Sequence, residues 1–174
     1  FIKYSKELLE ANPGNLSAKM KLGEVYYQEG MYEFAIEQFE SVKELLPSYP
    51  KVNYYLAHVY IKLHNIVKAE EMARKELELN PMLATSFYIM GEVHVLKEEY
   101  RDAIIMFEKS ISLDAQWSEP LIAMAQIRIK QNYGSEAIDL LNRALRQDAS
   151  NPLVHKLLGD AYRAAGQRTL AREK

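Results

Sequence analysis

The residue types that most often carry chemistry are few and scattered in this chain of 174 residues. The chain has no cysteine, which excludes thiol chemistry and a disulfide framework. Its four histidines lack the helical spacing that would pair two of them on a metal; they are His58, His64, His94 and His155. We recognise no glycine-rich phosphate loop and no Ser-His-Asp arrangement. The sequence therefore predicts a non-catalytic chain without a metal or cofactor.

Glu24 and Glu92 are the carboxylates that best fit a shared surface, because both stand at the same place in a repeating unit. General acid–base catalysis needs two such groups that converge in one cleft and have separated pKa values. A whole repeat lies between Glu24 and Glu92, so this convergence is not expected. The spacing of the two glutamates therefore favours a role in binding over a role in catalysis.

The elements that must position these side chains recur every 34 residues, without insertion or deletion. Steps of that size from Gly23 reach only small residues, at Ala57, Gly91, Ala125 and Gly159. Steps from Ala35 reach alanine each time, at Ala69, Ala103, Ala137 and Ala171. A small residue lets two helices approach closely, where a larger one would overpack the contact by roughly 1–3 kcal/mol. A fixed period of this length predicts a solenoid of stacked helix pairs.

One period holds Leu22-Gly23, Tyr26, Ala35, Phe39 and Pro47 at fixed offsets. This pattern resembles the tetratricopeptide repeat (TPR), and the resemblance covers the whole chain. Some positions drift: Ala73 stands at the Phe39 position, and His94 stands at the Tyr26 position. The resemblance implies an all-α fold, a right-handed α-solenoid of antiparallel helix pairs. At that place in the repeat we expect His94 to be a hydrogen-bonded core residue.

We expect a single TPR array over residues 1–174. It divides into a half repeat at 1–15, repeats at 16–49, 50–83, 84–117 and 118–151, and a partial repeat at 152–174. First helices are predicted near 16–29, 50–63, 84–97, 118–131 and 152–165, with an exposed turn at His64. Second helices are predicted near 33–45, 67–79, 101–113 and 135–147. Because both ends fall inside second helices and no initiator methionine is present, we expect a segment excised from a longer protein.

Composition excludes some classes of partner but does not decide the cellular compartment. The formal net charge of −2 is made of interleaved acids and bases, so no basic field for nucleic acid is expected. No apolar run approaches the length of a membrane span. The absence of cysteine fits the cytoplasm, which is slightly favoured, and also fits a bacterial periplasm.

The resemblance implies a binding groove lined by the first helices, with ligands contacted from the second, fifth, sixth, ninth, twelfth and thirteenth positions of each. The fifth, ninth and twelfth positions combine aromatic, aliphatic and acidic side chains, which predicts a partner segment that is apolar and carries basic residues. We expect Tyr54 and Tyr88 to be partly exposed; the alternative is that some of these residues pack between helices. The candidate partner-binding residues are Met20, Glu24, Tyr27, Tyr54, His58, Ile61, Tyr88, Glu92, Ile122 and Gln126.

The same positions argue against one known kind of partner. Relatives that bind a chaperone's C-terminal carboxylate use Lys at the fifth and Asn at the ninth position of a repeat. This chain has Met20 and Glu24 there, or Tyr54 and His58 one repeat later. The carboxylate clamp is absent.

These observations favour a protein–protein interaction scaffold that binds a peptide or helix in its groove. Two alternatives stay open. One is a module that self-assembles through the ends of the array. The other is the regulatory arm of a larger enzyme or envelope assembly machine.

Overall fold

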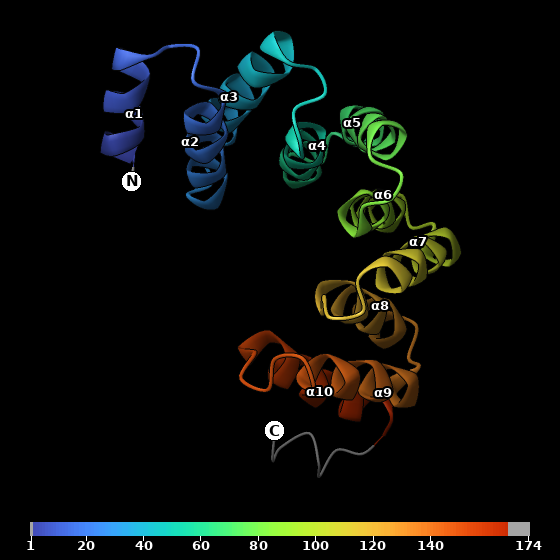
Figure 1. Ribbon diagram of the computed structural model, residues 1–174. Helices are drawn as coiled ribbons and strands as arrows, with labels where there is room; N and C mark the ends of the chain where they lie inside the picture. Colours follow the sequence, from blue (N-terminus) through green and yellow to red (C-terminus); the bar gives the residue numbers. More distant parts are fainter. Residues whose placement is uncertain (1, 167–174) are drawn as a thin grey trace. The chain divides into compact units, whose positions relative to one another are not determined.

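The structure is a computed structural model that describes residues 2–166. Within these residues all regular structure is α-helical, as predicted, and the helices are joined by short turns (Figure 1). The helices are α1 (Ile2–Ala11), α2 (Leu16–Gln28), α3 (Tyr32–Leu45), α4 (Val52–Lys62), α5 (Ile66–Leu79), α6 (Ala84–Leu96), α7 (Tyr100–Leu113), α8 (Glu119–Lys130), α9 (Gly134–Leu145) and α10 (Pro152–Ala164). The last predicted second helix, around Ala171, lies outside the described residues.

The predicted helices from α2 onward are confirmed to within two residues at each end. The largest difference at a helix start is at α4, which begins at Val52 instead of residue 50. Lys51 has a φ of 65°, in the left-handed region, so it ends the turn and cannot belong to the helix. The 34-residue period therefore predicts where each helix lies, and the local backbone conformation decides at which residue it begins and ends.

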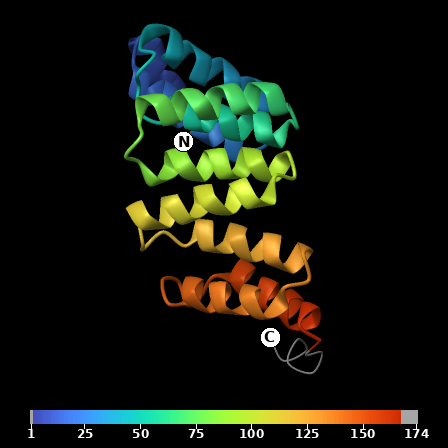
Figure 2. The ribbon, with the colours of Figure 1, turned by 90° about the vertical axis from the view of Figure 1, so that its right-hand side faces the viewer.

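The chain divides into two compact units, Phe1–Pro81 and Met82–Lys174, called here the N-terminal and C-terminal units. Within each unit a first helix packs against the second helix that follows it, and Figure 2 shows α6 to α9 stacked in this way. First helices of neighbouring repeats also touch: α2 contacts α4, and α6 contacts α8. The Cα atoms of the second helices α3 and α5 stay more than 8 Å apart, as do those of α7 and α9. Each unit thus has a closely packed first-helix face.

The turn after each of the first helices α2, α4, α6, α8 and α10 has one residue in the left-handed region, and these residues are 34 apart. They are Gly30 (φ 75°), His64 (53°), Glu98 (61°), Asn132 (63°) and Gly166 (77°). The residue after each of the first four closes the turn with a backbone hydrogen bond to the end of the first helix, as Met31 N–H does to the carbonyl of Tyr26 at 2.8 Å. Glycine and asparagine suit this conformation, whereas histidine and glutamate are strained in it. His64 is exposed there, as predicted.

The small residues of the period allow the close approach that the sequence predicts. A Cβ built on Gly23 would lie 2.5 Å from the ring of Phe39, and one on Gly91 would lie 2.5 Å from the ring of Phe107. Both rings are fully buried. Where the register has Ala57 instead of glycine, the residue at the ring position is Ala73, and both are fully buried. The drift from Phe39 to Ala73 is therefore matched by a larger residue on the facing helix.

The start of α4 is capped by a side chain from another helix. Its N-cap residue, Lys51, makes no side-chain capping bond. Glu76 of α5 is fully buried and accepts a hydrogen bond from the backbone N–H of Tyr54, with a second from Asn80 Nδ2 at 3.0 Å. Burial raises the pKa of Glu76 above its usual value. The carboxyl of Glu76 thus satisfies a helix-end donor and fixes α4 against α5.

None of the helices in the described part of the chain has the length and apolar character needed to cross a membrane.

Candidate functional site

The first-helix face of the N-terminal unit carries a cluster of rings centred on His58. The His58 ring lies 4.5 Å from the ring of Tyr54 on its own helix and 6.1 Å from that of Tyr27 on α2. Tyr54, His58 and Ile61 share one side of α4 because they are spaced four and three residues apart. These residues are partly exposed. The α2–α4 contact thus places Glu24 and Tyr27 of α2 beside the part of α4 that carries Tyr54 and His58. Ile61, also a predicted residue, lies one turn after His58 on the same helix.

His58 is held neutral in this cluster. Burial lowers its pKa to about 4, and the positive charge of Lys62 one turn later acts in the same direction. At neutral pH the imidazole is therefore an uncharged ring with hydrogen-bonding nitrogens. It adds to the aromatic surface and brings no positive charge to it.

Tyr55 belongs to the same site, although it was not among the predicted residues. Its hydroxyl donates a hydrogen bond to the Glu24 carboxylate, and its ring is stacked on Phe39 at 5.3 Å. Burial raises the pKa of Tyr55 to about 12, and the nearby charge of Glu24 adds to the increase. Tyr55 therefore positions the acidic group of this face. It occupies the sixth position of its first helix, which is itself a known contact position of the family.

The C-terminal unit presents a different first-helix face. Glu92 of α6 and Gln126 of α8 line one pocket of about 130 Å³, together with Tyr100 and Lys130. Tyr88 lies one turn before Glu92 on α6 and packs against Trp117, with ring centres 4.7 Å apart. Tyr88 is partly exposed, as is Tyr54, which confirms the expectation for both.

Lys130 and Tyr100 are functional candidates that the sequence reasoning missed. The Lys130 ammonium donates hydrogen bonds to the Tyr100 hydroxyl and, at 3.1 Å, to the Glu98 carboxylate. These bonds raise the pKa of Lys130. Lys130 stands at the thirteenth position of its first helix, so the family's contact positions would have found it. Tyr100 begins a second helix, and only the packing places it here.

Two of the predicted groove residues are placed in the packing between helices. Met20 is 5% exposed and Ile122 is 7% exposed. Ile122 belongs to the buried cluster that α8 forms with its neighbours. This matches the alternative that some apolar residues at the fifth position pack between helices.

His94 is hydrogen-bonded, as predicted, but is less buried than a core residue. Its side chain is 20% exposed, and Nδ1 lies 2.7 Å from a carboxylate oxygen of Glu99. Asp102 brings a third possible ligand atom within 4.8 Å of these two. The Glu99 carboxylate is also 3.2 Å from the Lys97 ammonium, so protein groups already bind both His94 and Glu99. The His94–Glu99 hydrogen bond and the Lys97–Glu99 ion pair thus account for this group of side chains without a metal ion.

Comparison with known proteins agrees with this structure. A family model described as "Anaphase-promoting complex, cyclosome, subunit 3" matches residues 2–76, and one described as "Tetratricopeptide repeat" matches residues 95–173. The crystal structure of the APC/C hetero-tetramer Cut9–Hcn1 contains a chain that superimposes with a TM-score of 0.89 at 20% identity, covering 98% of this chain and 34% of that one. The chain belongs to the tetratricopeptide repeat family.

Two curated relatives resemble most of the chain. TPR repeat-containing protein MJ1428 of Methanocaldococcus jannaschii is 25% identical over 185 aligned positions, covering 94% of this chain and 32% of that protein. Anaphase-promoting complex subunit 7 of Arabidopsis thaliana is 22% identical over 160 aligned positions, covering 90% of this chain and 28% of that protein. The chain therefore spans about a third of the length of these relatives. Proteins of this family generally act as scaffolds for protein interactions and are typically non-catalytic.

Proposed function

We propose that the chain is a non-catalytic scaffold that binds a partner protein on the first-helix faces of its units. The observation that carries the proposal is the ring cluster around His58, which is partly exposed and lies beside a fixed carboxylate. Aromatic residues of this kind bury a large area while losing little conformational freedom, which makes them effective binding anchors.

The partner that fits this face is an apolar peptide or helix with basic residues. Tyr27, Tyr54 and Ile61 offer apolar area, and neutral His58 does not oppose a cation. Glu24 bonds to Tyr55 and pairs with the exposed Lys21 ammonium at 3.3 Å, and Glu92 lies in the other unit. These two carboxylates favour a partner that carries Lys or Arg over an acidic one. Met20 and Ile122 are removed from the contact set because they are buried. Relatives named as anaphase-promoting complex subunits support a role in holding proteins in an assembly.

The test compares wild-type protein with the Tyr54→Ala/Tyr88→Ala variant in a pull-down quantified by mass spectrometry. We expect helicity near wild type and a selective loss of specific partners. Removing two aromatic anchors should cost about 2–4 kcal/mol of binding if both contact the partner. Val67→Ala is the matched control, because Val67 is 79% exposed on the second helix α5.

Equal recovery of the same partners by both baits would contradict the proposal and move the interaction away from the first-helix faces. Recovery of only the chain itself would favour self-assembly.

A further inference from the structure

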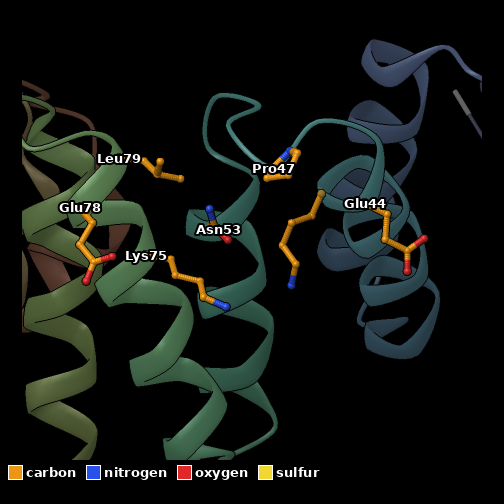
Figure 3. Close-up of a pocket in the computed structure, with 7 residues that line it drawn as sticks. Glu44, Pro47, Asn53, Lys75, Glu78 and Leu79 are labelled. Carbon is orange, nitrogen blue, oxygen red and sulfur yellow. The ribbon is translucent and has the colours of Figure 1, made fainter.

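A second pocket lies on the side of the N-terminal unit that the second helices form. It has a volume of about 300 Å³ and opens between the last turns of α3 and α5 and the first turn of α4 (Figure 3). Its lining residues are Lys43, Glu44, Pro47, Asn53, Lys75, Glu78 and Leu79. None of them belongs to the first-helix face described above, so this is a separate surface.

The pocket exists because the second helices of neighbouring repeats diverge. The Cα atoms of α3 and α5 stay more than 8 Å apart, and long side chains bridge the space. Lys43 is one of them, with Nζ 3.7 Å from Sδ of Met72. Pro47, Leu79 and the methylene chains of the lysines make the walls largely apolar, so an aliphatic group is the natural occupant.

Asn53 lines this pocket and carries a buried hydrogen-bond acceptor without a partner in the described part of the chain. The residue is 2% exposed, and its Oδ1 has no hydrogen-bond partner among the residues that the structure describes. Figure 3 shows its side chain extending from α4 into the space between Pro47 and Lys75. Buried amide oxygens almost always have a donor in folded proteins. A ligand N–H group that displaces the side chains covering Oδ1 would supply the missing donor.

The C-terminal unit shows that the fold does not need this arrangement. Two periods after Asn53 the chain has Leu121, which is 1% exposed and apolar. Two periods after Leu79 it has Gln147, whose Nε2 donates to the backbone carbonyl of Ala115 at 2.6 Å. Ala115 in turn stands two periods after Pro47. In the C-terminal unit the Gln147 side chain thus joins the corresponding walls, and Leu121 stands in place of the buried asparagine. Gln147 Oε1 is itself buried without a partner among the described residues.

The charges around the pocket favour a basic ligand. Both lysines are already paired, Lys43 with Glu40 at 2.5 Å and Lys75 with Glu71 at 2.7 Å. Their positive charges are therefore largely balanced inside the protein.

Glu44 and Glu78 add further carboxylates at the rim, and both are exposed. They stand in the last turns of α3 and α5, where the helix dipole adds negative potential. The rim is thus complementary to a positive charge.

We propose that this pocket binds an aliphatic side chain carried on an extended segment of a partner protein. A backbone N–H of that segment donates to Asn53 Oδ1, and Lys or Arg residues on either side of the aliphatic residue lie against Glu44 and Glu78. The pocket is a docking site for a short basic–aliphatic–basic motif, distinct from the first-helix face.

The experiment is an NMR titration of the ¹⁵N-labelled chain with the capped peptide acetyl-Lys-Leu-Lys-amide. We expect saturable shifts of the Asn53 side-chain amide and of the backbone amides of Asn53 and Leu79. Acetyl-Glu-Leu-Glu-amide and acetyl-Lys-Gly-Lys-amide are the matched probes, and each should bind at least about ten-fold more weakly because one lacks the charge match and the other the aliphatic group.

Two variants test the residues separately. Asn53→Leu copies the residue of the C-terminal unit, so it should fold and should weaken the peptide at least about ten-fold. The double variant Glu44→Lys/Glu78→Lys changes only exposed positions and should weaken binding of the peptide by a similar factor. Tyr27→Ala, on the first-helix face, should bind the peptide as wild type does, which separates this site from the proposed function.

Three results would overturn the proposal. One is wild-type affinity in the folded Asn53→Leu variant, and another is equal affinity for the charge-reversed peptide. The third is the same set of shifts on raising the protein concentration without peptide, which would assign the pocket to a second copy of the chain.

Discussion

Gly23 and Phe39 show how one atom determines the packing of a helix pair. The 2.5 Å approach of a Cβ at residue 23 to the Phe39 ring leaves no room for a methyl group. Three combinations of residues occur at this contact in different repeats. Glycine faces phenylalanine in two repeats, Ala57 faces Ala73 in another, and Ala125 stands opposite Leu141 in the fourth. The size of one partner therefore sets the permitted size of the other.

We predict that Gly23→Ala lowers the free energy of unfolding by about 1–3 kcal/mol because the methyl group overpacks the Phe39 ring. Phe39→Leu should be destabilising alone, yet it should reduce the cost of Gly23→Ala, as the Ala125 and Leu141 combination suggests. Urea unfolding of both single variants and the double variant measures this coupling. Strictly additive effects would show that the two residues do not share the contact.

His58 should make stability depend on pH. Its folded pKa of about 4 lies below the value of about 6.5 expected when unfolded. The unfolded state therefore binds the proton more readily, so this contribution is complete above pH 6.5 and is lost as the pH falls towards 4. The full loss corresponds to about 3 kcal/mol.

Chemical unfolding between pH 7 and pH 4 measures this dependence. His58→Gln should flatten the part of the slope that His58 contributes, whereas Val67→Ala, at an exposed and uncharged position, should keep the wild-type slope. An unchanged slope in His58→Gln would mean that the imidazole is not held neutral.

At the scale of the element, the recurring left-handed residue is the feature that ends each first helix. The 34-residue register puts glycine at two of these five turns, and histidine, glutamate and asparagine at the others. The same backbone is thus imposed on residues with different intrinsic preference, and the turn hydrogen bonds hold it in place.

We predict that His64→Gly raises the free energy of unfolding by about 0.5–1 kcal/mol, because relief of left-handed strain exceeds the entropy that glycine adds to the unfolded chain. Asn132→Gly should have a smaller effect, since asparagine tolerates this conformation. Thermal and urea unfolding of the two variants makes the comparison. A larger gain at Asn132 than at His64 would contradict the explanation.

At the scale of the whole molecule, the chain is a series of helix pairs, and each pair is stabilised by its contacts with the neighbouring pairs. The first-helix contacts, such as that between α2 and α4, carry this coupling inside a unit. A scaffold of this kind can vary the surface of one repeat without changing the packing of a distant one.

We expect the Gly23→Ala substitution to have a local effect in native-state hydrogen exchange. Protection should fall most in α2 and α3, less in α4, and little in α8 and α9, because each repeat touches only its neighbours. An equal fall in all helices would show that the chain unfolds as a single cooperative unit.

Much of the fold follows from the sequence alone. The period, the helix boundaries and the close contacts at Gly23 and Gly91 are all readable, because helix formation and helix pairing within a repeat depend on residues near one another in the chain. The partly exposed tyrosines, Tyr54 and Tyr88, were predictable for the same reason: a residue's position in the register largely decides the side of the helix on which it lies.

Tertiary structure decided the rest. Whether Met20 and Ile122 are exposed depends on the side-chain volumes of neighbouring helices, and here they are buried. The Glu24–Tyr55 bond and the Lys130–Tyr100 bond join different helices, so neither is visible in a single helix's pattern. The unsatisfied oxygen of Asn53 is the clearest case, since an asparagine near a helix start ordinarily implies a local cap. Only the divergence of α3 from α5 makes that residue line a pocket.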